Sequence, residues 1–228
     1  MLYATVDGVK RTAEPKLKGV CPDCQGEMIS KCGSVMPWHW AHRELTDCDP
    51  WYEGETAWHL SWKAKFPVEF SEISIVKNGV RHRADVQFPS GAVFEIQHSS
   101  ISPEDIQARE EFYGEMAWLF DAREAYASER LYINRDKGSY LTYRWKFPRR
   151  TITSCHKPVF LQVDDSTIWR LLSMHADGQC YGACVQMDKE QWLCKFCLAH
   201  GVQPVRPKPE TFTIGSVKIP TSFCKRAA

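Results

Sequence analysis

The chain has 228 residues, of which 43% are hydrophobic and 25% charged, with a formal net charge of +1. This composition is ordinary for a globular protein and argues against disorder, and no apolar run reaches the roughly 18 residues of a membrane span. The first residues lack the basic start and apolar run of a secretion signal, so we expect a cytoplasmic protein without a membrane partner.

The first half of the chain predicts a hairpin, a helix and three strands. The expected bounds are 2–13 for the hairpin, 53–66 for the helix, and 70–76, 80–88 and 92–97 for the strands. Asp7-Gly8 is a tight-turn signal inside the hairpin. Residues 19–50 carry Cys and His pairs and turn residues, with too few aliphatic residues for a core of their own.

The second half predicts a mixture of helices and strands. Ser102 followed by Pro103 is a helix start, and this helix is expected to run to about residue 116. The other expected elements are a strand over 118–120, a hairpin of 131–134 and 140–145, a strand over 159–163, a helix over 167–174 and a helix from Asp188 to about residue 200. The tail beyond is rich in proline and is expected to be extended.

Ten cysteines in a chain without a secretion signal indicate metal ligation rather than disulfides. The first candidate set has the pattern C-x2-C…H-x2-H, which suits tetrahedral zinc in a segment that cannot build a core. Its predicted ligands are Cys21, Cys24, His39 and His42, with Cys32 and Cys48 as rival ligands. We expect this zinc to be structural.

A second zinc site is possible near the C-terminal end. Its candidate ligands are Cys180, Cys184, Cys194 and Cys197. The alternative is core packing, because Trp192 and Phe196 lie among these cysteines and the three-residue gap in the first pair is unusual.

The acidic residues of the second and third expected strands predict a site for a hard cation. Asp85 is followed ten residues later by Glu95, and the Pro-Ser-Gly turn between them brings the two strands together. Gln97 shares a strand face with Glu95, because side chains two apart point the same way. Two carboxylates on adjoining strands can hold Mg²⁺ or Mn²⁺ beside a phosphodiester. Such spacing also recurs by chance in sheets.

Residues near this pair extend the candidate site. Glu55, His59 and Lys63 are spaced four apart and form one face of the expected helix, which either faces the metal and phosphate or is simply solvated. Ser99 precedes a helix N-terminus and can bind a phosphate there, although a plain loop is equally expected. Arg109, early in that helix, can reach the phosphate or Glu95, or lie at the surface.

The stretch RHRADVQFPSGAVFEIQHSSISPEDIQAREEFY resembles the nuclease-like domain of the CoiA-like competence protein family, which is similar to PD-(D/E)xK nucleases. CPDC…HWAH resembles the zinc-binding segment of that family, and ETAWHLSWK its first core helix. The resemblance covers roughly residues 1 to 125. It implies a restriction-endonuclease-like core, a role in DNA processing, metal ligation by Asp85 and Glu95, Gln97 at the usual lysine position, and Glu55 as the helix acid.

Glutamine at the lysine position is a departure from the superfamily motif. Gln97 can orient a water by hydrogen bonding but cannot stabilise developing negative charge as a cation does. The missing cation can come from Lys63, from Arg83 or from protonated His98. If none reaches the site, the domain binds DNA without cutting it.

We therefore expect an α/β protein with a restriction-endonuclease-like (PD-(D/E)xK) core. The expected parts are a hairpin and zinc-binding module at 1–50, the core at 51–147 and a C-terminal extension at 148–228. The expected function is metal-dependent hydrolysis of DNA, with an inactive DNA-binding or recombination adaptor as the alternative. A homodimer is possible. The basic, aromatic stretch from Tyr143 to Pro158 can bind a phosphate backbone, although a basic sheet edge that prevents aggregation explains it nearly as well.

Overall fold

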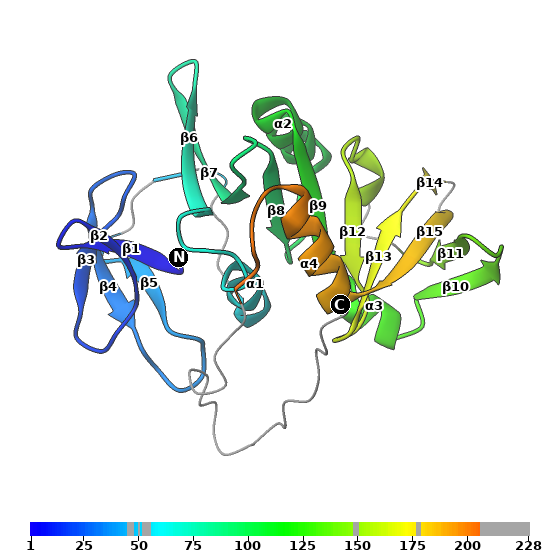
Figure 1. Cartoon of the computed structure of the whole chain (residues 1–228), viewed down its shortest axis with the longest axis horizontal. Coiled ribbons are helices and arrows are strands. Elements are labelled where there is room, and N and C mark those ends of the chain that lie inside the picture. The colour runs from blue at the N-terminus through cyan, green and yellow to red at the C-terminus, as the bar shows by residue number, and fades with distance from the viewer. Residues whose placement is uncertain (45–47, 50, 52–55, 148–150, 177–178, 206–228) are drawn as a thin grey trace, which may run out of the picture.

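A computed structural model describes residues 1–44, 48–49, 51, 56–147, 151–176 and 179–205 (Figure 1). It has two sheets of unequal size joined through helix α1. Among the described helices, none has the length and apolar character that crossing a bilayer requires.

The N-terminal sheet has five strands in the order β2-β1-β3-β4-β5. They are β1 (Tyr3–Val6), β2 (Val9–Thr12), β3 (Lys18–Val20), β4 (Glu27–Lys31) and β5 (His39–His42). The expected hairpin is confirmed, with Asp7 and Gly8 at φ of 50° and 78° in the turn. Residues 19–50 contribute Met28 and Trp40, both 0% exposed, to an apolar cluster that they share with Val6 and other residues of the hairpin.

The large sheet has ten strands in the order β10-β11-β15-β13-β12-β9-β8-β7-β6, with β14 paired to β15. Their bounds are β6 (Ser71–Lys77), β7 (Val80–Gln87), β8 (Val93–Gln97), β9 (Met116–Asp121), β10 (Leu131–Asp136), β11 (Leu141–Trp145), β12 (Val159–Gln162), β13 (Thr167–Leu171), β14 (His175–Ala176) and β15 (Cys180–Asp188). Strand β9 pairs in parallel with β8 and with β12, and the other pairs are antiparallel.

The helices cover both faces of this sheet. They are α1 (Ala57–Lys63), α2 (Pro103–Tyr113), α3 (Arg123–Ala127) and α4 (Lys189–Ala199), with a short 3-10 turn, η1, at Ile152–Ser154. Ser102 caps α2 by accepting from the Asp105 amide, and Asp188 caps α4 by accepting from the Gln191 amide, as expected. Helices α1 and α4 share one apolar cluster with Phe94 and Ile96, whereas α2 packs in a second cluster with Val93. Strand β8 therefore alternates between two cores, as its sequence predicts.

The region after residue 147 differs most from expectation. Residues 167–174 were expected to be a helix, but Thr167–Leu171 is strand β13. The β-branched pair Thr167-Ile168 favours a strand, and pairing with β12 on one side and β15 on the other stabilises it. The boundary expected at 147/148 does not divide the sheet, since β12, β13 and β15 lie between β9 and β11. Strands β12, β13, β14 and β15 thus complete the large sheet.

Candidate functional site

The candidate site lies where strands β7 and β8 separate. Their backbone register runs through Gln87 paired with Val93 and Val86 paired with Phe94. One residue further, side chains take over the hydrogen bonds: the Asp85 amide donates to Glu95 Oε1 at 3.2 Å, and the Ile96 amide donates to Asp85 Oδ2 at 2.8 Å. The two acids therefore meet across the split strands, as the hairpin spacing predicts.

Asp85 is held by an imidazole and an ammonium, both from helix α1. His59 Nε2 lies 3.0 Å from Asp85 Oδ2, and Lys63 Nζ lies 3.0 Å from Oδ1. Burial would raise the pKa of Asp85, but the charges of His59 and Lys63 and the hydrogen bonds outweigh it and hold the pKa well below its usual range. The carboxylate is thus ionised, and the spacing of His59 and Lys63 by four residues does place both at the acid.

Glu95 experiences the opposite balance. Its Oε2 lies 3.2 Å from Arg109 Nη1, and the side chain is almost fully buried. Burial and the neighbouring charge of Asp85 raise the pKa of Glu95 to about 8, with Arg109 opposing the shift. Two carboxylates that close cannot both ionise freely without a cation between them. The pair therefore disfavours its fully ionised form unless extra positive charge is present.

These side chains line one cavity of about 50 Å³. Polar groups supply much of its lining, including His59, Lys63, Asp85, Glu95, Gln97 and Ser99. A single water needs about 10–15 Å³ by this measure, so the space suits an ion with a few waters. Gln97 Nε2 donates to the Ser99 carbonyl at 3.0 Å. Glu55 lies outside the described residues.

Three side chains were candidates for the missing cation, and the structure separates them. Lys63 lies at Asp85, but it also contacts Glu72 Oε1 at 2.9 Å and is 3% exposed. Arg83 lines the cavity but pairs with Asp23, and His98 contacts Asp121 at 3.0 Å. Lys63 is thus the ammonium that reaches the acids.

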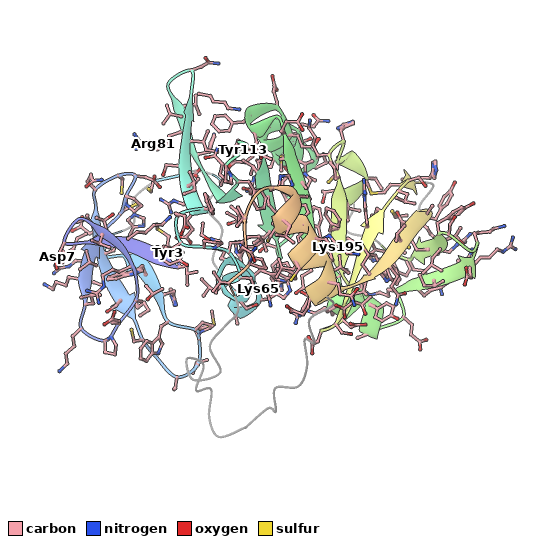
Figure 2. All side chains as sticks on the ribbon, viewed as in Figure 1. Tyr3, Asp7, Lys65, Arg81, Tyr113 and Lys195 are labelled. Carbon is pink, nitrogen blue, oxygen red and sulfur yellow. The ribbon has the colours of Figure 1, made fainter. Side chains whose placement is uncertain are left out.

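Glu72 is a site residue that the sequence analysis did not identify. It lies in β6 opposite Asp85, between the strand partners of Val86 and Ala84. Its carboxylate accepts from the Leu2 and Tyr3 amides at 2.8 and 3.1 Å as well as from Lys63. Figure 2 shows Tyr3 on β1, at the side of the small sheet that meets the rest of the molecule. A buried acid in a strand that follows a Lys-bearing helix is the only signal that could have found it.

A second cluster lies in the N-terminal sheet. Ligand atoms of Cys21, Cys24, His42 and Cys48 all lie within 4.8 Å of one another. Cys21 Sγ is 3.5 Å from Cys48 Sγ, and Cys24 Sγ is 3.3 Å from His42 Nε2. Three thiols and an imidazole are donors that suit tetrahedral zinc. The donor set can therefore hold a metal such as zinc.

The comparisons with known proteins bear on this same segment. Residues 9–50 match the family model described as competence protein CoiA, N-terminal domain. No curated protein and no solved structure matches the chain. The match contains all four residues of the cluster, so the resemblance to the CoiA-like family is confirmed here.

One predicted ligand of the CoiA-type segment is wrong. His39 is replaced by Cys48, which was a rival candidate. Residues 39–42 form strand β5, and side chains three apart on a strand point to opposite faces. His39 instead contacts the Pro37 carbonyl through Nδ1 at 2.8 Å.

The second cysteine set does not assemble. Cys180 and Cys184 are buried in the apolar cluster of one sheet face, whereas Cys197 is buried in the cluster of the other. Burial raises the pKa of Cys184 and of Cys197 to about 12, which keeps both as neutral thiols. Within the described part of the chain, no group of metal-ligand atoms includes Cys194 or the other three. Core packing, the alternative reading, accounts for them.

Cys48 and Asp49, at the end of the CoiA-type segment, and Trp51, just after it, connect the cysteine cluster to the cavity. We call these three residues the connector. Asp49 contacts His82 Nδ1 at 3.0 Å and accepts from the Arg83 amide at 2.8 Å. The Trp51 ring stacks on His82, and the Trp51 carbonyl accepts from Arg109 at 3.0 Å. Arg109 is the residue that holds Glu95, so the cluster and the acidic pair share one contact chain.

Proposed function

We propose that the chain is a metal-dependent deoxyribonuclease with a PD-(D/E)xK-type core, acting in DNA processing. The observation that supports this most is the convergence of Asp85, Glu95 and Lys63 on one cavity at the split between β7 and β8. The confirmed CoiA-type segment agrees with a competence-related role. The order of a helix, three antiparallel strands, a helix and a parallel strand (α1 to β9) agrees with a restriction-endonuclease-like core.

In this proposal Asp85 and Glu95 hold Mg²⁺ or Mn²⁺, for which carboxylate oxygens are preferred ligands. The cation supplies Lewis-acid activation of water and of the scissile phosphate. The raised pKa of Glu95 fits this role, since a bound cation supplies the charge that favours the ionised pair.

The other residues bind, orient and neutralise. Lys63 stabilises negative charge that develops on the phosphate, and His59 positions Asp85. Gln97 orients a water through its amide, and Ser99 and Arg83, which line the same cavity, contact the phosphate backbone. DNA is the substrate in this scheme, and the ammonium of Lys63 replaces the lysine that the motif lacks.

DNA cleavage tests the proposal directly. Plasmid, linear and single-stranded DNA are incubated with the zinc-loaded protein and Mg²⁺ or Mn²⁺. We expect the wild-type protein to cut DNA. Asp85→Asn and Glu95→Gln should each lower the cleavage rate at least 100-fold, because each substitution removes a cation ligand. The matched control is Glu110→Gln, which changes a buried acid that accepts from Trp118 rather than from the cavity. Cutting that survives in both cavity variants defeats the assignment.

A second candidate, an inactive DNA-binding adaptor, is favoured by one specific observation. Both oxygens of each acid already have a protein partner, with His59, Lys63 and Ile96 at Asp85 and Arg109 at Glu95. A cation must displace at least one of them. DNA binding without cutting in any divalent metal, equal in wild type and Asp85→Asn, is the outcome that selects the adaptor.

A further inference from the structure

The far end of the large sheet carries a second hollow, of about 440 Å³. It lies over β10, β11, β14 and β15, which Figure 1 shows on the right, at the opposite end of the sheet from β6 and β7. We call it the basic groove. Its lining includes Arg135, Lys137, Thr142, Arg144, His175 and Tyr181. No acidic residue lines it among the residues that the structure describes.

The charge of the basic groove is uncompensated. Arg135, Lys137 and Arg144 come from two neighbouring strands and the turn between them, and all three are exposed. Within the described ranges none of them forms an ion pair, and the Arg144 guanidinium only reaches Gln179 Oε1 at 3.4 Å. Three unpaired cations beside one hollow attract a chain of phosphates.

An aromatic pair adds a second kind of contact. His175 on β14 and Tyr181 on β15 face each other across the strand pair, with ring centroids 5.4 Å apart. Tyr181 is 36% exposed, so ring surface remains for a ligand. Arg144 is the strand partner of Tyr181, which places a cation beside the aromatic surface. Exposed rings next to cations are the combination by which proteins hold unpaired bases.

The wall of the basic groove is built rather than incidental. Ser173 packs directly over Gly182, where any Cβ would lie 1.9 Å from the Ser173 carbonyl oxygen. Tyr143 donates to that carbonyl at 3.1 Å, and the Ala183 amide donates to Ser173 Oγ at 3.0 Å. These bonds fix the segment that leads to His175. The groove therefore keeps its shape before any ligand arrives.

We infer that the basic groove binds single-stranded DNA, with phosphates on Arg135, Lys137 and Arg144 and a base on Tyr181. A duplex keeps its bases stacked inside, so the aromatic pair would have no partner there, whereas an unpaired strand offers base faces. The inference extends the proposed DNA-processing function. It assigns to β10, β11, β14 and β15 the binding of single-stranded DNA at a site distant from the acidic cavity.

The test measures binding separately from cutting. A dye-labelled 20-mer of deoxythymidine is titrated with the full-length, zinc-loaded protein without added Mg²⁺ or Mn²⁺, and fluorescence anisotropy gives the Kd at several salt concentrations. We expect Arg135→Ala/Arg144→Ala to weaken binding at least tenfold and to reduce the log–log salt slope by about 1.4, or about 0.7 per lost phosphate contact. Tyr181→Leu should weaken binding about tenfold and leave the salt slope unchanged.

The matched control removes the same charge elsewhere. Lys31→Ala/Lys195→Ala changes two exposed lysines, one on β4 and one on α4, where Figure 2 labels Lys195. We expect its Kd to stay within twofold of wild type. Equal losses in the control and the groove variant overturn the inference, as does a Kd unchanged by Arg135→Ala/Arg144→Ala.

Two further arms fix the ligand. A 20-base-pair duplex should lose less than threefold in the groove variant, and an equal loss for duplex and single strand overturns the choice of unpaired DNA. A uridine 20-mer of RNA that binds more tightly than the DNA overturns the choice of DNA. Failure of the nuclease proposal appears differently, as absent cutting in wild type with groove-dependent binding intact.

Discussion

Lys63 is buried between two carboxylates, 2.9 Å from Glu72 and 3.0 Å from Asp85. A lysine is rarely buried unless it is paired, and here one ammonium serves an acid from each of two neighbouring strands. This arrangement explains how helix α1 is fixed over β6 and β7. It also places a cation at the proposed cleavage site without a lysine at position 97.

Removing this ammonium should destabilise the fold. Lys63→Met leaves Glu72 and Asp85 buried and facing each other, which costs about 3–5 kcal/mol. Urea unfolding at pH 7 measures the loss, and Lys63→Met/Glu72→Gln should recover part of it. Lys65→Met, which removes the ion pair with Glu190 and the contact of the ammonium with the Trp62 ring, should cost only about 1 kcal/mol. Equal effects at positions 63 and 65 contradict this reading.

Glu72 gives the fold a defined response to acid. Burial opposes ionisation, but the charges of Lys63 and the N-terminal amine and the Leu2 amide lower the pKa of Glu72 from 4.5 to about 2. A pKa that is depressed in the folded state contributes stability above pH 4.5, and this contribution is lost as the pH falls toward 2. We expect a loss of about 3 kcal/mol over this range. Urea unfolding between pH 6 and pH 2.5 should show a weaker pH dependence in Glu72→Gln, and identical slopes in the two proteins contradict the assignment.

At the scale of elements, the sequence predicts the acidic pair because the information is local. Asp85, Glu95 and Gln97 lie on two strands joined by a short turn, so spacing and strand period fix their relation. The same local logic finds the helix caps Ser102 and Asp188. The assignment of His39 as a zinc ligand was wrong because it required His39 and His42 to point the same way. Residues 39–42 form a strand, in which side chains three apart point to opposite faces.

Long-range pairing accounts for what the sequence could not supply. The sequence near residues 167–171 does not show that these residues will pair as a strand between β12 and β15. The separation of Cys184 from Cys197 by the sheet likewise depends on strand order, which spacing does not reveal. The sequence left three possible positions for the Arg109 side chain: at the phosphate, at Glu95 or at the surface. The structure places it in contact with Glu95.

Through the connector, the CoiA-type segment contacts residues of the large sheet and of the cavity. Purified protein should hold one zinc per chain, and Cys24→Ser should lower this content whereas Cys194→Ser should not. Metal analysis of the two variants separates the site that assembles from the set that does not. Equal zinc loss in both would restore the second site.

Removal of this zinc should loosen β7 through Asp49, which contacts His82 and Arg83. Hydrogen exchange followed by mass spectrometry should show faster exchange in peptides that cover β7 after chelation, with β13 unchanged as the internal reference. Uniform exchange across both strands contradicts the coupling.

At the scale of the whole molecule, the large sheet runs through the expected domain boundary. Strands β12, β13 and β15 separate β9 from the β10–β11 hairpin, so residues 131–145 have no sheet neighbour without them. A chain that ends at residue 147 should therefore fail to fold cooperatively, as judged by circular dichroism during urea unfolding. A sharp, native-like transition in the truncated chain contradicts the single sheet.

The central claim is that Asp85 and Glu95 together hold a divalent cation. Binding of Mn²⁺ to the zinc-loaded protein, followed by electron paramagnetic resonance of the free ion, measures this directly, with Glu95→Gln as the test variant and Glu110→Gln as the buried-acid control. We expect one Mn²⁺ per chain in wild type and in Glu110→Gln, with affinity reduced at least tenfold in Glu95→Gln. Equal Mn²⁺ affinity in all three proteins, or no binding to wild type at millimolar Mn²⁺, would contradict the claim.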